Sequence, residues 1–168
     1  VEGMMKATGG YVTVWDVVNE AISGGGDDGE GFYVLQSASN VSENDAQNNF
    51  YWQDYLGNED YARIAVAAAR KYYAENGGTA PLKLFINDYN LESDWDDNKK
   101  AKSLVHWIKK WEADGVTQID GIGTQMHVSC YANAATQKSK EEHVVQMFEI
   151  LAASGKLVKI SELDMGYI

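Results

Sequence analysis

The chain has 168 residues, enough for one domain with a buried core, and a formal charge of −11 from 25 acidic and 14 basic residues. It has no block of Lys and Arg to follow a phosphate backbone, which disfavours nucleic acid as a partner. No apolar run approaches the roughly 20 residues of a membrane span, and the first ten residues lack the pattern of a signal peptide. The single cysteine, Cys130, cannot form a disulfide within the chain, so it does not indicate whether the protein works in an oxidising or a reducing compartment.

Strand-like and helix-like runs alternate along the sequence. The predicted strands, rich in β-branched and aromatic residues, are 11–19, 82–88, 119–126 and 157–163. Apolar residues at helical spacing predict helices over 59–75 and 97–113, and a third helix that opens with the capping pair Ser139 and Glu142. The order βαβαβαβ predicts parallel strands with right-handed crossovers, either in an open doubly wound sheet or in part of a (β/α)₈ barrel.

A long irregular segment, residues 23–57, follows the first predicted strand. A loop of that length is more typical of a functional segment than of a simple connector. In the helix after it, one face recurs at helical spacing, and we expect that face to be buried: Tyr61, Ile64, Ala65, Ala68 and Tyr72.

Polar residues end each of the four predicted strands. They are Asn19 and Glu20, then Asn87, Asp88, Tyr89 and Asn90, then Gln125 and His127, then Glu162 and Asp164. The carboxyl ends of parallel strands meet at one edge of a sheet, so we expect a single polar ring there. Residues two apart share a face of a strand, which pairs Gln125 with His127 and Glu162 with Asp164. Gly121 and Gly123 lie on the same face as Gln125 and leave room for a neighbouring strand or a ligand to come close.

The residue types in this ring narrow the chemistry. There is no Ser beside a base, no glycine-rich phosphate loop and no Cys cluster, and a single histidine leaves a zinc site short of nitrogen ligands. A carboxylate-rich Mg²⁺ or Ca²⁺ site stays open on residue type alone. His106 and His143 are predicted on helix surfaces. Two carboxylates on separate strands suit glycoside hydrolysis, in which one protonates the leaving oxygen and the other attacks the anomeric carbon, and Glu20 and Glu162 are the natural pair.

Four motifs carry a family resemblance: "WDVVNEAI" (15–22), "FINDYN" (85–90), "GIGTQMHVS" (121–129) and "ISELDMGY" (160–167). In this order they resemble the strand 4, 5, 6 and 7 signatures of the family 10 glycoside hydrolases, which are retaining endo-β-1,4-xylanases. The resemblance implies an α/β fold, a partial (β/α)₈ TIM barrel with parallel strands and intervening helices. It also implies that residues 1–168 are part of a single glycoside hydrolase catalytic domain, with both ends inside that domain.

The resemblance also implies roles for individual residues. Glu20 would be the general acid/base and Glu162 the nucleophile, with Ser161 replacing the usual Thr before it. His127 would hydrogen-bond the nucleophile, with Asp164 as its own partner. The substrate-binding residues would be Asn19 on the sugar 2-hydroxyl, Gln125 in the same subsite, and Asn87, Tyr89 and Asn90 of the "NDYN" segment, the last two on the leaving-group side. No cofactor and no metal is implied.

The implied substrate is xylan or xylo-oligosaccharides, with no nucleic acid or membrane partner and a secreted or periplasmic location. We expect the remaining barrel strands to come from another segment or chain, or the open edges to self-associate, and the 168 residues alone to be inactive. Two alternatives stay open: a non-catalytic or incomplete xylan-binding fragment, and an unrelated βα protein such as a carboxylate-bound Mg²⁺ enzyme.

Overall fold

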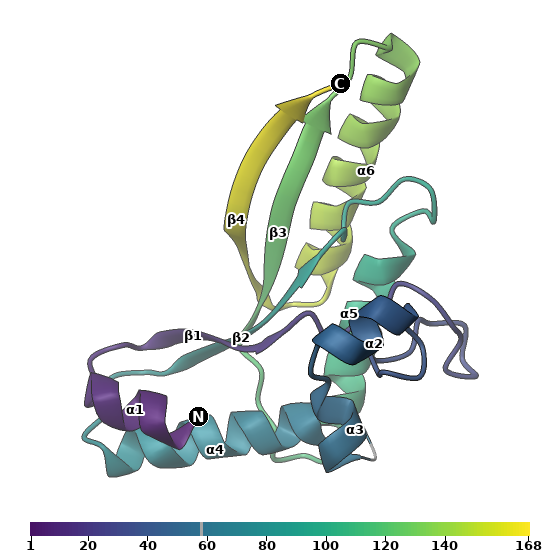
Figure 1. The fold of residues 1–168 in the computed structure, drawn as a ribbon. Helices are drawn as coiled ribbons and strands as arrows, with labels where there is room; N and C mark the ends of the chain where they lie inside the picture. The colour runs from purple at the N-terminus through teal and green to yellow at the C-terminus, as the bar shows by residue number, and fades with distance from the viewer. Residues whose placement is uncertain (58) are drawn as a thin grey trace.

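The computed structural model describes residues 1–57 and 59–168, and within them the chain forms six helices and four strands (Figure 1). The helices are α1 (Glu2–Thr8), α2 (Glu43–Asn48), α3 (Trp52–Leu56), α4 (Tyr61–Glu75), α5 (Lys99–Glu112) and α6 (Ala134–Ala153). The strands are β1 (Val14–Asn19), β2 (Lys83–Tyr89), β3 (Gly121–Cys130) and β4 (Leu157–Tyr167). The predicted alternation of strands and long helices is confirmed.

The strands form one parallel sheet in the order β1-β2-β3-β4. Figure 1 shows its strong twist: β3 and β4 run side by side along α6, while β1 and β2 cross the lower part of the molecule above α4. Neighbouring strands of a sheet normally twist relative to one another, and here the twist curves the sheet enough for side chains of β1 and β4 to meet across it. The ion pair between Asp16 Oδ1 and Lys159 Nζ, 2.9 Å long, spans the sheet in this way.

Two irregularities in the pairing decide which side chains reach the concave face. The register shifts between Asp16 and Val18 in β1, and β4 passes from Ile160 to Glu162 opposite consecutive residues of β3. A bulge adds one residue to a strand and so reverses the alternation of faces beyond it. Asp16 and Asn19 therefore share the concave face although they are three apart.

The core lies between the sheet and the helices. Leu84, Ile86 and Ile122 are fully buried on the outward face of β2 and β3, and Trp107 and Trp111 of α5 are almost fully buried against it. The predicted helix over 97–113 is confirmed as α5, whose apolar residues Ala101, Leu104, Ile108 and Trp111 are buried.

Glycines on the concave face let neighbouring side chains cross over β3. A Cβ added at Gly121 would lie 2.2 Å from Cε1 of Phe85, and one at Gly123 would lie 2.4 Å from Oδ1 of Asn87. Both clashes involve side chains of the adjacent strand β2. The expectation of close approach at these two glycines is confirmed, and its cause is the packing of Phe85 and Asn87.

Two details of the helices differ from the sequence-based expectation. In α4 the buried residues are Tyr61, Ala62, Val66, Ala69 and Tyr73. Ile64, predicted on the buried face, is 47% exposed. The prediction was wrong here because alanines on both sides of this helix leave its apolar face poorly defined by the sequence. The third long helix begins earlier than Ser139: Asn133 caps it by accepting hydrogen bonds from Ala135 and Thr136 N–H. The Ser139 hydroxyl instead donates to Asp94 at 2.9 Å.

Candidate functional site

A chain of hydrogen bonds crosses all four strands, near the carboxyl ends of β1 and β2 and midway along β3 and β4. Asn19 Oδ1 accepts from Asn87 Nδ2 at 2.8 Å and from Gln125 Nε2 at 3.1 Å. Asn87 Oδ1 accepts from the Ser161 hydroxyl at 2.5 Å, and Gln125 Nε2 also lies 3.0 Å from Glu20 Oε1. Asn19 is exposed, and among the described residues its amide N–H groups have no hydrogen-bond partner, whereas its oxygen has two.

The backbone of Glu20 has an unusual conformation where the chain leaves β1. Its φ is 55°, in the left-handed region that costs a non-glycine residue on the order of 1 kcal/mol or more. Its N–H donates to the carbonyl of Asn87 at 2.7 Å, which ties the turn to β2. This conformation turns the chain sharply after Asn19 and brings the Glu20 carboxylate back to Gln125.

A second group of polar residues lies on β3 and β4. His127 Nε2 is 3.1 Å from Glu162 Oε2, and His127 Nδ1 is 2.6 Å from Asp164 Oδ2. The hydrogen bond to Asp164, followed by the charges of Asp164 and the contact with Glu162, raises the pKa of His127 above its ordinary value. An imidazolium here donates to both carboxylates and holds Glu162 in place.

Tyr89 and Asn90 border the cleft but join neither network. Burial and then the charges of Asp88 and Glu20 raise the pKa of the half-buried Tyr89 phenol. Asn90 is exposed, with φ 55°, and lines a cleft of about 570 Å³ beside His127 and Trp95. A second hollow, of about 390 Å³, is lined by Glu20 and Tyr89 together with residues of the segment between β1 and α4, namely Gln36, Asp45, Asn49 and Tyr51.

The structure thus brings seven of the predicted residues together in two groups and leaves Asp88, Tyr89 and Asn90 out of both. Asn19, Glu20, Asn87 and Gln125 form one group, and His127, Glu162 and Asp164 form the other. Asp88 does not belong to the ring. Alternation along β2 points it to the opposite face, where it is fully buried and pairs with Lys100 Nζ at 2.9 Å.

Sequence reasoning missed two contributions to this site. Ser161 looks like a neutral replacement in the "ISELD" motif, yet its hydroxyl bonds Asn87 from two strands away. The bulge in β4 turns Ser161 and Glu162 to the same side, and no spacing rule predicts it. Lys100 was missed as well. Its one signal is the alternation that places Asp88 towards the helices, where a buried carboxylate needs a cation.

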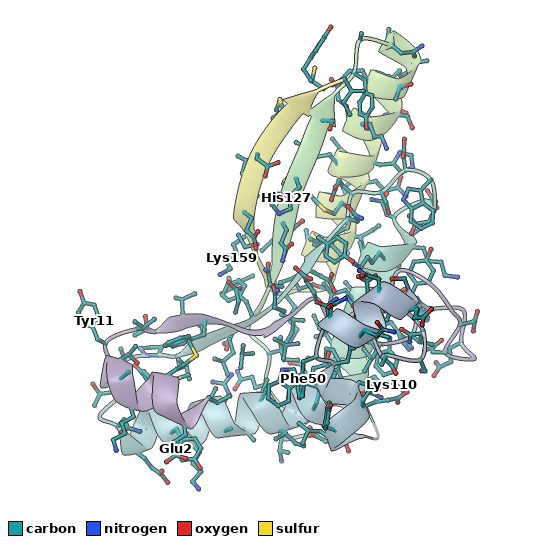
Figure 2. The ribbon with its side chains drawn as sticks, in the orientation of Figure 1. Glu2, Tyr11, Phe50, Lys110, His127 and Lys159 are labelled. Atoms are coloured by element: carbon teal, nitrogen blue, oxygen red, sulfur yellow. The ribbon has the colours of Figure 1, made fainter. Side chains whose placement is uncertain are left out.

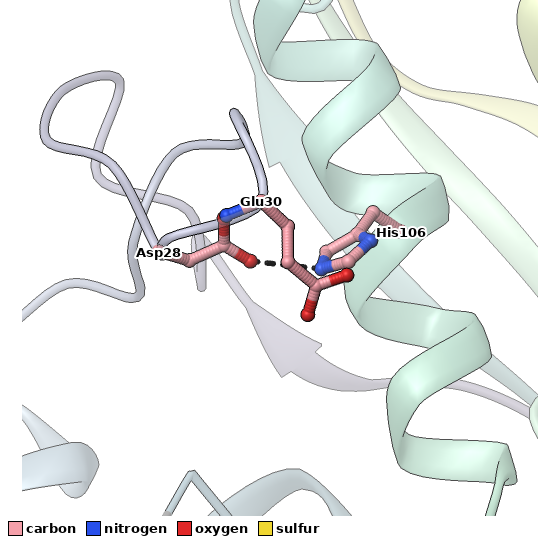
Figure 3. Close-up of side chains that lie close together, drawn as sticks. All are labelled: Asp28, Glu30 and His106. Carbon is pink, nitrogen blue, oxygen red and sulfur yellow. Dashed lines mark hydrogen bonds and ion pairs between the residues drawn. The ribbon is translucent and has the colours of Figure 1, made fainter.

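One other cluster has residue types that can bind a metal. Ligand atoms of Asp28, Glu30 and His106 lie within 4.8 Å of one another (Figure 3). Asp28 is already occupied by hydrogen bonds: Oδ1 accepts from Glu30 and Phe32 N–H at 2.9 and 3.1 Å, and Oδ2 lies 2.8 Å from His106 Nε2. Burial opposes ionisation of Asp28, but these partners outweigh it and keep its pKa below the usual value. The contact anchors the loop on α5, so His106 is a covered residue and not an open helix surface.

Figure 2 places Lys159 near the start of β4 and His127 further along β3. Among the described residues, no helix is long and apolar enough to cross a membrane.

Comparisons with known proteins show the family and the fold of the chain. A family model described as glycosyl hydrolase family 10 matches residues 1–167. Endo-1,4-beta-xylanase C of Paenibacillus barcinonensis is 32% identical over 163 residues, covering 93% of this chain and 12% of that protein. Endo-1,4-beta-xylanase A of Thermoanaerobacterium saccharolyticum is 31% identical over 151 residues, covering 90% of this chain and 10% of that protein.

A solved structure is similar as well. The chain titled as the structure of GH10 from Paenibacillus barcinonensis has a TM-score of 0.69 and 31% identity, covering 98% of this chain and 40% of that one. The present chain therefore spans less than half of this solved relative and about a tenth of the two curated relatives. Because the family model matches nearly the whole sequence and the strands and helices align with part of that fold, this chain belongs to glycosyl hydrolase family 10 and forms part of its (β/α)₈ barrel.

Proposed function

We propose that this chain carries both catalytic carboxylates of a retaining endo-β-1,4-xylanase, with Glu20 as the acid/base and Glu162 as the nucleophile. One observation carries the proposal. Glu20 directly follows β1 and Glu162 lies midway along β4, and each is held by a side chain of β3, Glu20 by Gln125 at 3.0 Å and Glu162 by His127 at 3.1 Å. Two carboxylates that are positioned from the same central strand of a parallel sheet suit a double displacement.

The reaction starts with attack of a Glu162 oxygen on the anomeric carbon of a bound xylose unit. The glycosidic bond breaks as the carboxylic acid of Glu20 gives its proton to the leaving oxygen, and a xylosyl ester of Glu162 forms. Glu20, now a carboxylate, takes a proton from water, and the water oxygen displaces Glu162 from the anomeric carbon. Two inversions at one carbon retain its configuration, a course that calls for carboxyl groups roughly 5–5.5 Å apart.

The surrounding residues support this chemistry in specific ways. The free N–H donors of Asn19 suit a sugar hydroxyl next to the reacting carbon, and Gln125 keeps both Asn19 and Glu20 in position. His127 donates to Glu162, and Asp164 fixes the imidazole from its other nitrogen. We assign Tyr89 and Asn90 to the leaving-group side, together with the hollow that Glu20 and Tyr89 share.

The proposal places residues 1–168 within a single catalytic domain whose remaining strands complete the barrel and the substrate cleft. The relatives named above are xylanases, which makes xylan or xylo-oligosaccharides the proposed substrate. We keep a secreted or periplasmic location as part of the proposal because xylan is an extracellular polymer. One solved relative is titled an intracellular xylanase, so fractionation of the source cells is the direct test.

The test uses the intact catalytic domain with Glu20→Ala and Glu162→Ala, and Glu149→Ala as a control at an exposed glutamate of α6. We expect wild type and control to release reducing sugar from xylan with the β configuration first, observed by NMR. Glu162→Ala loses turnover of every substrate. Glu20→Ala falls on the order of 10²- to 10⁴-fold on xylan, keeps activity on aryl xylosides with good leaving groups, and is accelerated by azide.

Two outcomes would contradict the proposal. A wild-type domain that binds xylan without releasing sugar would make the chain part of a non-catalytic binding protein. Equal losses of Glu20→Ala on activated and unactivated substrates, with no response to azide, would refute its role as acid/base.

A further inference from the structure

A buried ion pair lies directly behind the cleft, on the helix side of the sheet. Asp88 at the end of β2 is 0% exposed and Lys100 in the first turn of α5 is 3% exposed, and Oδ1 of the first lies 2.9 Å from Nζ of the second. Both groups are far from water, where a charge is stable only with a close partner and further hydrogen bonds. Neither residue points into the cleft.

The carboxylate of Asp88 holds the backbone that follows Glu20. Its Oδ2 accepts the N–H of Ile22 at 2.9 Å, and Ile22 is itself fully buried. Glu20 thus has an anchor on each side: its own N–H on the carbonyl of Asn87 at 2.7 Å, and Ile22 on Asp88. A residue kept at φ 55° needs such support, because the left-handed conformation is not its preferred one.

The same pair also reaches Tyr89. Asp88 Oδ1 accepts the N–H of Tyr89 at 2.9 Å, and Lys100 Nζ lies 3.4 Å from the centre of the Tyr89 ring. An ammonium over an aromatic face is attractive and fixes the ring plane, more strongly where water is excluded. The buried pair therefore holds the backbone next to Glu20, through Ile22, and contacts Tyr89 directly. Glu20 and Tyr89 both line the hollow of about 390 Å³.

Stability alone does not explain why such a pair is present. A buried ion pair is often no more stabilising than apolar residues of the same volume, whereas its directional bonds fix one geometry. Here Asp88 accepts the backbone N–H of Ile22, two residues after Glu20, and Lys100 lies over the ring of Tyr89.

We propose that Asp88 and Lys100 are positioning residues that hold Glu20 and Tyr89 in the geometry needed to protonate the leaving group. This inference rests on the proposed function. Loss of the pair should weaken protonation of the leaving oxygen. It should leave attack by Glu162 nearly intact, because Glu162 is held by His127 of β3, which is itself held by Asp164 of β4, and neither residue contacts the pair.

The test is made in the intact catalytic domain with the double variant Asp88→Asn/Lys100→Met, which removes both charges and leaves no lone buried ion. Glu112→Gln/Lys156→Met is the matched control, since these two residues also form a partly buried ion pair, at 2.6 Å, but away from the cleft. Rates are measured on aryl xylobiosides with leaving groups of increasing basicity. We expect kcat/KM to fall on the order of 10- to 100-fold for basic leaving groups, and less than about 3-fold for activated ones. The control keeps the wild-type dependence.

The outcomes separate the two proposals. No turnover by the wild type on any substrate would refute the proposed function. An active wild type whose double variant loses the same factor on every leaving group would refute only the positioning role. If the double variant fails to fold, amide exchange in the wild type decides. The Ile22 N–H is expected to exchange as slowly as the slowest amides of β2, and rapid exchange at Ile22 would overturn the inference.

Discussion

The imidazole of His127 lies 3.1 Å from the carboxylate of Glu162 and reaches it from the adjacent strand, with its other nitrogen held by Asp164 at 2.6 Å. The side chains of His127 and Glu162 are nearly half exposed, so this contact is open to solvent. If Glu162 is the nucleophile, as proposed, an imidazolium in this position would stabilise its carboxylate before attack, and this attraction would be lost as the ester forms.

His127 is expected to act by charge and position and not as a metal ligand. His127→Ala should lower xylan hydrolysis without changing the metal content of the protein, because its two nitrogens are engaged by carboxylates. EDTA should leave the wild type active. A loss of activity on chelation that a divalent ion restores at micromolar concentration would contradict this assignment.

Asp164→Asn is expected to lower the pKa of His127 toward its ordinary value of 6.5, since the hydrogen bond to Asp164 is the largest cause of the upward shift. Because the folded pKa is raised, the stabilising effect of the imidazolium is fully present below about 6.5 and is lost as pH rises through the folded pKa. NMR titration of the ring should therefore give a lower midpoint in the variant. Asp97→Asn, beside His143, is the control and should leave the His127 midpoint unchanged.

Gly123→Ala is expected to disrupt the network that links Asn87 to Asn19. The added Cβ would lie 2.4 Å from Asn87 Oδ1, so Asn87 must move, at a cost in unfolding free energy of about 1–3 kcal/mol. Activity should fall as well. Gly166→Ala on β4 is the control, because its Cβ would lie 3.6 Å from the Ser129 hydroxyl, an ordinary contact. Equal stability of the two variants in denaturant titrations would speak against this packing argument.

The 168 residues produced alone are expected to associate in solution and not to cleave xylan. β1 and β4 are the outer strands of the sheet, and β4 presents Leu163 at 66% and Tyr167 at 78% exposure. Such strands favour pairing with other chains, and a cleft built from part of the barrel lacks contacts that hold the sugar. Light scattering and xylan assays, with and without the remaining barrel strands in trans, measure both effects. A monodisperse monomer with turnover of about 1–10³ per second would be the opposite result.

Much of the architecture follows from local rules in the sequence. The four strands and the long helices are visible as period and order, but β3 and β4 continue to Cys130 and Tyr167, so His127, Glu162 and Asp164 lie within strands and not at their ends. The misplaced details have physical causes that spacing does not contain. The bulges before Val18 and at Ser161 change which side chains share a face, and Asp88 alternates away from its polar neighbours towards Lys100. The buried face of α4 was ambiguous in the sequence because the helix is rich in alanine. The start of α6 was misplaced because Asn and Ser can both cap a helix, and the structure has Asn133 as the cap and not Ser139.

The role of Glu162 as nucleophile can be tested by trapping the covalent intermediate. An activated xylobioside carrying fluorine at C2 forms the glycosyl ester but slows its hydrolysis, so the sugar stays on the attacking residue. After incubation with the intact catalytic domain, protease digestion and mass spectrometry locate the label. The account predicts one sugar on Glu162, and none in the Glu162→Ala variant. A label on Glu20 or on any other residue, or an active enzyme that accumulates no label, would contradict it.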